Sequence, residues 1–110
     1  MIVIKNKSAL LKMEIAGKKL ATLFTRLPEL LVPGISTLMV DDWISKELKK
    51  EGLASATKGY MGYRHHSCIS VNDVVVHGVP SEVVVLSNGD LVKVDICASW
   101  KGCFADMARC

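Results

Sequence analysis

The chain has 110 residues, of which 50% are hydrophobic and 23% are charged, and its net charge is +3. That length fits one small domain or part of a larger one. The positive charge is mild, and Lys18-Lys19 and the run from Lys46 to Lys50 are typical of solvated helix faces, which argues against a nucleic-acid-binding protein. No apolar run is long enough to cross a bilayer, and the first residues lack the features of a signal peptide. We therefore expect a cytoplasmic protein.

The hydrophobic share is high for so short a chain, which suggests apolar surface that another part covers. Four cysteines in a chain without a secretion signal are expected to be reduced thiols. Their spacing contains no pair separated by two residues, so it does not predict a structural zinc site. We expect Cys97, Cys103 and Cys110 to be buried as small hydrophobic residues.

A first helix is predicted from Ser8, which is a suitable N-cap, to the breaking pair Pro33-Gly34. Apolar residues recur within it at spacings of three and four, which predicts one buried stripe. The stripe consists of Met13, Ala16, Leu20, Phe24, Leu27 and Leu31.

A second helix is predicted to follow, with Ser36 or Thr37 as its N-cap and Gly52 as its C-terminal cap. Its apolar face contains Val40, Trp43, Ile44 and Leu48.

From Leu53 onward the pattern is extended, with β-branched residues separated by glycine, proline and asparagine. Val83-Val84-Val85 and the residues from Asp90 to Asp106 predict a run of antiparallel strands. Together with the two helices, these strands predict an α+β fold in which an antiparallel sheet has both helices on one face.

The segment from Asp90 to Asp106 predicts a β-hairpin with its turn at Trp100-Lys101. In that register three apolar pairs share one face: Val94 with Met107, Ile96 with Ala105, and Ala98 with Cys103. The opposite face places Asp95 directly across from Asp106, with Cβ atoms about 4.5–5.5 Å apart. Two carboxylates in such a pair require a cation or a shared proton. The alternatives are a register shifted by one residue, which the apolar pairs disfavour, or carboxylates that diverge into solvent.

The segment from Gly59 to Pro80 reads GYMGYRHHSCISVNDVVVHGVP, and Asn88-Gly89-Asp90 and the Asp95 and Asp106 pair follow it. In order and spacing these elements resemble the type I methionine aminopeptidases, over essentially the whole chain. Several motifs linked at fixed spacing are more specific than any one of them. The sequence departs from the family at Met61 and Arg64, where a histidine and a proline are usual.

The resemblance implies that residues 1–110 form a single domain, which is the N-terminal half of a methionine aminopeptidase catalytic domain. It implies one half of the pita-bread fold. The C-terminal half, which in the family supplies a histidine and two glutamates as further metal ligands, would be absent from this chain.

The resemblance also implies the roles of individual residues. Asp95 and Asp106 would bind two divalent ions, which could be cobalt, manganese, iron, zinc or nickel. His77 would contact the substrate near the scissile amide, where it could act as a proton donor. Tyr60, Tyr63 and Cys68 would form the pocket for the methionine side chain.

From the residues alone, His77 could equally be a satisfied histidine at the end of a strand of valines, and the two tyrosines could be turn anchors. Asn72 occupies a family position whose backbone can help to hold a monovalent cation. His65 and His66 have no such support, and we expect them to be loop residues.

The implied function is hydrolysis of the N-terminal methionine from nascent proteins with a small second residue, through a metal-bridged hydroxide. The partners would be nascent polypeptides, the missing C-terminal half and, as a further candidate, the ribosome. The 110-residue chain alone is expected to be inactive. The alternative is a non-catalytic pita-bread relative, or a truncated half-domain, that acts only in binding. A proline-directed peptidase fits less well, because Tyr60, Tyr63 and Cys68 suit a methionine pocket.

Overall fold

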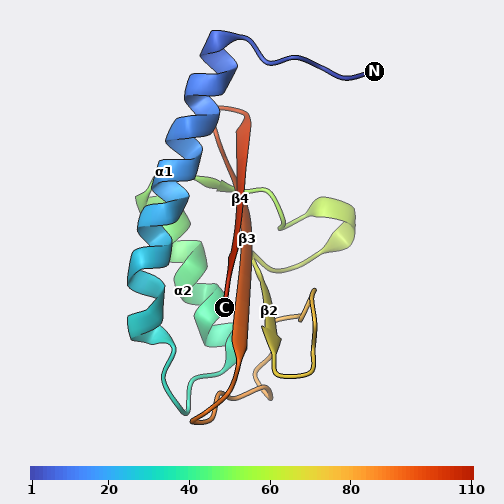
Figure 1. Ribbon diagram of the computed structural model, residues 1–110. Helices are drawn as coiled ribbons and strands as arrows, with labels where there is room; N and C mark the ends of the chain where they lie inside the picture. The colour runs from blue at the N-terminus through green and yellow to red at the C-terminus, as the bar shows by residue number, and fades with distance from the viewer.

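The computed structural model describes residues 1–110 and contains two helices and a four-stranded antiparallel sheet. The elements are α1 (Lys7–Leu30), α2 (Thr37–Lys50), β1 (Ala54–Ser55), the short 3₁₀-helix η1 (Tyr60–Gly62), β2 (Cys68–Val71), β3 (Val92–Trp100) and β4 (Cys103–Arg109). Both helices lie on one side of the sheet, and the loops before and after β2 lie on the other (Figure 1). The predicted α+β architecture is therefore confirmed. Neither helix is long and apolar enough to serve as a membrane span.

Helix α1 begins and ends earlier than the sequence predicted. Its N-cap is Asn6, whose side chain accepts a hydrogen bond from the Ala9 N–H at 2.8 Å, so the assignment to Ser8 was wrong by two residues. The helix ends at Leu30, ahead of the Pro33-Gly34 pair. The predicted stripe is nevertheless buried along most of its length, at Ala16, Leu20, Phe24 and Leu27, together with Leu23.

Both predicted caps of α2 are confirmed. The Ser36 hydroxyl accepts from the Met39 N–H at 3.2 Å. At the other end Gly52 has a positive φ of +70°, and its N–H donates to Lys49 O while the Leu53 N–H donates to Leu48 O. These two bonds form the Schellman motif, which satisfies carbonyls that the last helical turn leaves free.

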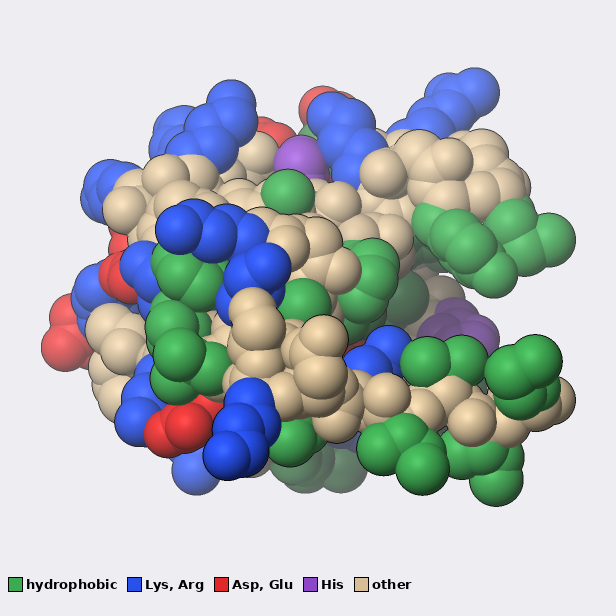
Figure 2. Space-filling model, turned by 90° about the horizontal axis from the view of Figure 1, so that it is seen from above, with side chains coloured by type: hydrophobic (Ala, Val, Ile, Leu, Met, Phe, Trp, Pro, Cys, Tyr) green, Lys and Arg blue, Asp and Glu red, His purple; other side chains and the backbone are tan.

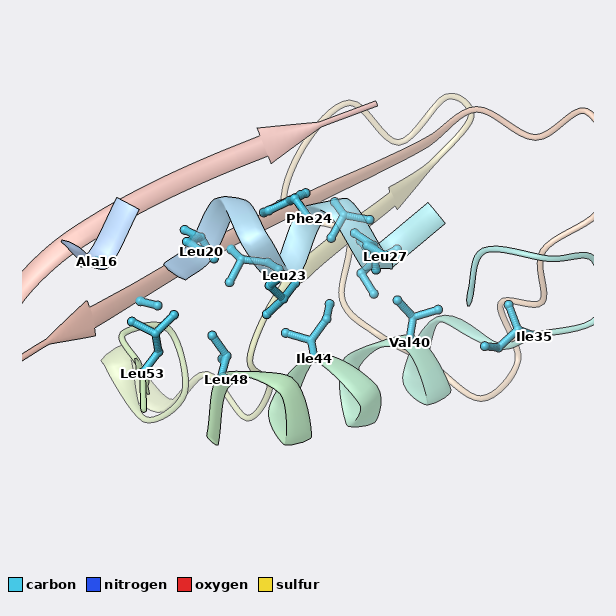
Figure 3. Close-up of a cluster of buried hydrophobic side chains, with 14 of the residues drawn as sticks. Ala16, Leu20, Leu23, Phe24, Leu27, Ile35, Val40, Ile44, Leu48 and Leu53 are labelled. Carbon is cyan, nitrogen blue, oxygen red and sulfur yellow. The ribbon is translucent and has the colours of Figure 1, made fainter. Parts of the chain in front are cut away.

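The hydrophobic core lies between the two helices and the inner face of the sheet (Figure 3). Helix α2 contributes Val40, Ile44 and Leu48, and each is at most 2% exposed. The sheet contributes alternate residues of β3, namely Val94, Ile96 and Ala98, because successive side chains of a strand point to opposite faces. The other face of β3 is thereby left free for polar groups.

The β3–β4 register differs from the prediction by two residues. The turn is formed by Lys101 and Gly102, with φ values of +47° and +78°, so Trp100 pairs with Cys103. Positive φ at both central residues is typical of a type I′ turn, and Gly102 adopts it at no steric cost whereas a tryptophan would not. Because side chains alternate with a period of two, a shift of two keeps every residue on its predicted face. However, Asp106 pairs with Cys97 and Asp95 with Ala108, so the predicted direct pairing of the aspartates was wrong.

The valine segments are not strands. Val85 forms only an isolated bridge with Ser36, and residues 74–76 lie in a turn and loop after β2. Their β-branched side chains favour extended backbone, but no neighbouring strand pairs with them along a ladder. The predicted strands at Val83–Val85 and before His77 were therefore wrong.

All four cysteines are reduced, as expected. Cys97 and Cys103 are only half-buried and Cys110 is exposed, so the prediction that all three are buried was wrong.

Candidate functional site

The candidate site lies on the face of the sheet opposite the helices. Strand β3 presents Asp95 and Cys97 there, on the face that does not contribute to the core. Strand β2 places Cys68 directly across from Asp95. The β2–β3–β4 register thus brings together groups that are far apart in the sequence.

Asp95 and Asp106 are diagonal neighbours on adjacent strands. Burial raises the pKa of Asp95, and the Asp106 carboxylate raises it further through its charge and a hydrogen bond, while the nearby His77 acts in the opposite direction. Burial, followed by the charges of the two aspartates, also raises the pKa of the Cys97 thiol. The two carboxylates therefore lie close enough to repel each other, which a shared proton or a bound cation relieves.

These two carboxylates do not make a complete metal site by themselves. No group of three or more histidine, cysteine, aspartate or glutamate side chains in the chain is arranged to hold a metal ion.

Beside the aspartates is a cleft of about 530 Å³. It is lined by Thr57, Tyr60, Met61, Gly62, Tyr63, Cys68 and His77. Seen from above, two groups of hydrophobic side chains project on either side of a hollow that contains a histidine (Figure 2). All four residues that the sequence assigned to substrate contact therefore line one cleft.

Tyr63 and Cys68 are fixed to each other and to the backbone. The Tyr63 hydroxyl donates to Ser67 O at 2.8 Å, and the Cys68 thiol donates to the Tyr63 hydroxyl oxygen at 3.6 Å. Burial, followed by the hydrogen bond to Cys68, raises the pKa of Tyr63, so its phenol stays neutral at physiological pH. Tyr60 and Met61 form the more exposed lip of the cleft, and Met61 has a positive φ of +48°.

A residue that the sequence analysis missed, Asp41 of α2, anchors this wall of the cleft. Asp41 as a whole is only 2% exposed, and its carboxylate accepts from the His66 N–H at 3.0 Å and from the Ser67 hydroxyl at 2.6 Å. The ring of His65 lies 3.5 Å from the same carboxylate. His65 and His66 are loop residues, as predicted. The sequence did contain one signal of a buried carboxylate, because Asp41 directly follows Val40, which belongs to the apolar face of α2.

His77 is held on the outer edge of β2. The Ile69 N–H donates to Gly78 O at 2.8 Å, and the Gly78 N–H donates to the Ser70 hydroxyl at 2.9 Å. His77 itself has a positive φ of +57°. These contacts place its imidazole in the cleft and near Asp95.

Asn72 connects β2 to the turn before β3. Its side chain donates to Asp90 at 2.9 Å and accepts from the Leu91 N–H at 2.9 Å. The hydrogen bond from Asn72 lowers the pKa of Asp90. The backbone carbonyl of Asn72 accepts a hydrogen bond from the Lys93 ammonium at 2.8 Å. The resemblance implied that this part of the backbone helps to hold a monovalent cation, and here the positive group is the side chain of Lys93.

The chain matches known proteins over nearly its full length. The family model described as metallopeptidase family M24 matches residues 11–110. The methionine aminopeptidase of Mycoplasma capricolum is 37% identical over 98% of this chain and 43% of its own length. Methionine aminopeptidase 1 of Bacillus subtilis is 38% identical over the same shares of the two chains.

Solved structures agree with these sequence matches. The crystal structure of the Thermotoga maritima methionine aminopeptidase superposes with a TM-score of 0.93 at 39% identity, covering 98% of this chain and 43% of that one. The Rickettsia prowazekii methionine aminopeptidase gives 0.94 at 29% identity, covering 99% and 44%. The chain thus spans less than half the length of these relatives, and over that span it has the fold of half of their pita-bread structure.

Proposed function

Because this chain belongs to metallopeptidase family M24, as a homologue of the methionine aminopeptidases, we propose that its protein removes the N-terminal methionine from polypeptides with a small second residue. The observation that carries the proposal is the cleft that Tyr60, Tyr63, Cys68 and His77 share beside the two aspartates. Nascent chains are the corresponding substrates. The residues needed beyond those described here would come from the further length that the relatives possess.

The substrate pocket fits a methionine side chain. Aromatic faces from Tyr60 and Tyr63 and the soft sulfur of Cys68 suit a flexible, polarizable thioether. The neutral Tyr63 phenol, already bonded to Ser67 and Cys68, presents no charge that an apolar side chain would have to desolvate. The pocket therefore favours an uncharged and sulfur-containing side chain over a charged one.

Asp95 and Asp106 are the groups that would hold the metal, which we propose to be two divalent ions. Two observations support this assignment: Asp95 and Asp106 are diagonal neighbours on β3 and β4, and burial together with the Asp106 carboxylate raises the pKa of Asp95. Carboxylate oxygens suit divalent cations, and a cation removes the repulsion within the pair. When bound, such ions polarise a carbonyl and lower the pKa of water. Further donors have to join the two carboxylates, since no larger cluster exists within the 110 residues.

His77 would act on the substrate and not on the metal. His77 lines the same cleft as Tyr60, Tyr63 and Cys68 and lies close enough to Asp95 to lower its pKa, so the scissile amide would lie near its imidazole. From there it can donate a hydrogen bond or a proton to the departing amine.

The two roles can be separated experimentally in the protein encoded by the complete reading frame. Asp106→Ala should lower metal content and turnover of a Met-Ala-Ser peptide together. His77→Ala should leave metal content near normal and lower kcat and kcat/KM together by about 10²–10⁴-fold, as expected for a general acid–base group. Glu82→Ala, at an exposed carboxylate away from the cleft, is the control. If the His77 variant loses its metal as fully as the Asp106 variant, the proposed division of roles is wrong.

The second candidate function is binding without catalysis, by a half-domain. The observation that favours it is the absence of a cluster of three metal-binding side chains within these 110 residues. Peptide binding by the protein with no turnover in the presence of cobalt or manganese would support it over the enzyme.

A further inference from the structure

Two hydrogen bonds join Gly78, the residue after His77, to strand β2. One joins Ile69 N–H to Gly78 O, and the other joins Gly78 N–H to the Ser70 hydroxyl. The first involves only backbone atoms, so any residue at position 69 can form it. The second depends on the side chain of Ser70, which is 2% exposed. Ser70 is thus the side chain on β2 that bonds this loop.

The contact is close, and the loop needs it. A Cβ atom on Gly78 would lie 2.1 Å from Ile69 O, so the loop backbone lies directly against the strand. His77, one residue earlier, has a positive φ that an L-residue adopts at some cost. Most residues of this loop, including Val75 and Val76, are exposed and contribute little packing. The hydrogen bonds from Gly78 to β2 therefore contribute to keeping His77 in place.

We propose that Ser70 is a positioning residue for His77, holding the His77-Gly78 peptide against β2 so that the imidazole faces the cleft. Ser70 does not touch the substrate in this arrangement and acts only through Gly78 and His77. The inference rests on the proposed function for its effect on turnover. Its structural part, the docking of the loop, can be tested without any activity.

Removing the hydroxyl should affect the reaction more than substrate binding. Without its acceptor, the half-buried Gly78 N–H loses its partner, and the loop moves toward solvent to hydrate it. The methionine pocket, formed by Tyr60, Tyr63 and Cys68, lies on other segments and should keep its affinity. A displacement of the imidazole by about 1 Å can lower the rate about 10²-fold. We therefore expect kcat to fall while KM changes little.

The experiment compares Ser70→Ala, Ser70→Thr and Ser99→Ala in the protein from the complete reading frame, loaded with metal. Ser99 lies on β3, and its hydroxyl makes no hydrogen bond, so its loss is a matched control. Ser70→Ala should lower kcat by about 10–10²-fold, with KM within about twofold and unchanged metal content. Ser70→Thr retains the hydroxyl and should recover most of kcat. An unchanged kcat in Ser70→Ala, a loss of metal, or no recovery in Ser70→Thr would overturn the proposal.

A second measurement separates this proposal from the proposed function. Amide hydrogen exchange of Gly78 and the ring NMR signals of His77 report on loop docking whether or not the protein hydrolyses peptides. Both should change in Ser70→Ala and return in Ser70→Thr. If the wild-type protein does not cleave Met-Ala-Ser, the proposed function fails, and these signals alone decide the positioning role. Unaltered Gly78 exchange in a folded Ser70→Ala protein would show that Ser70 does not hold the loop.

Discussion

At the residue scale, position 78 requires glycine because the loop backbone there lies against the neighbouring strand β2. The absent side chain lets the loop backbone approach Ile69, where a Cβ would lie 2.1 Å from the carbonyl oxygen. Gly78→Ala should therefore push the loop outward and destabilise the fold by about 1–3 kcal/mol, as overpacking does. Gly17→Ala is the matched control, because a Cβ there meets nothing within 4 Å. It should stabilise α1 by about 0.5–1 kcal/mol. Urea unfolding of both variants tests this, and equal stabilities would contradict the predicted clash.

The raised pKa of Asp95 has a consequence for the stability of the metal-free protein. Because its pKa is higher in the folded state than in the unfolded state, the folded state binds the proton more tightly. The resulting stability is fully present below the unfolded pKa and is lost as the pH rises through the folded pKa. Asp90, whose pKa is lowered, contributes the opposite slope, so the comparison must be made between variants.

Asp95→Asn should abolish the loss of stability that accompanies ionisation of Asp95, and it should leave the metal-free protein more stable than wild type near pH 7. Asparagine carries no charge to repel Asp106, and relief of a cross-strand repulsion is worth up to about 1 kcal/mol. Thermal melts in EDTA from pH 3 to pH 8 would show the difference growing with pH. A constant difference across this range would mean that the Asp95 carboxylate is not the titrating group.

At the scale of elements, α2 contributes to the cleft as well as to the core. Its Asp41 carboxylate accepts hydrogen bonds from His66 and Ser67 and so ties the segment before β2 to the helix. Asp41→Ala leaves those donors without a partner and should cost about 1–3 kcal/mol. Asp41→Asn retains one acceptor oxygen and should cost less. Faster amide exchange at His66 in the alanine variant, compared with Asp42→Ala on the exposed side of α2, would confirm the anchor.

The sequence predicted elements and faces better than it predicted partners. The caps of α2 follow from residue types at its two ends, and the stripe of α1 follows from the spacing of apolar residues. Both signals are local in the sequence and do not depend on which element the helix packs against. The β3–β4 register depends on which residues form the turn. The apolar pairs could not distinguish the observed register from one shifted by two residues, because every residue lies on the same face in both. Asp41 was missed because its partners lie 25 and 26 residues away, a separation that local pattern does not reveal.

The candidate site shows the same division. The resemblance to the methionine aminopeptidases implied the cleft residues as a set, and the structure places Tyr60, Tyr63, Cys68 and His77 around one cavity. It did not indicate that a loop held by Ser70 carries His77, because the valines before it favour a strand. That loop conformation depends on a close backbone contact between Gly78 and β2, which only the three-dimensional structure shows.

At the scale of the whole molecule, large hydrophobic side chains are exposed outside the core. Val75 and Val83, in the segment between β2 and β3, are 74% and 88% exposed, and Phe104 of β4 is 58% exposed. Strand β4 pairs only with β3, so the N–H and C=O groups along its other edge have no strand partner. Exposed apolar patches and free strand edges both promote association.

A polypeptide consisting of residues 1–110 should therefore self-associate at high concentration. The apolar loops would be covered by a second copy, and the free edge of β4 could extend the sheet. Light scattering or sedimentation over a range of concentrations measures this directly. The double variant Val75→Lys/Val83→Lys should shift the equilibrium toward monomer, because it places charges in the patch without touching the core. Lys5→Ala/Lys7→Ala, at exposed positions near the N-terminus, serves as the control. A monomer at every concentration would show that these exposed valines do not by themselves drive association.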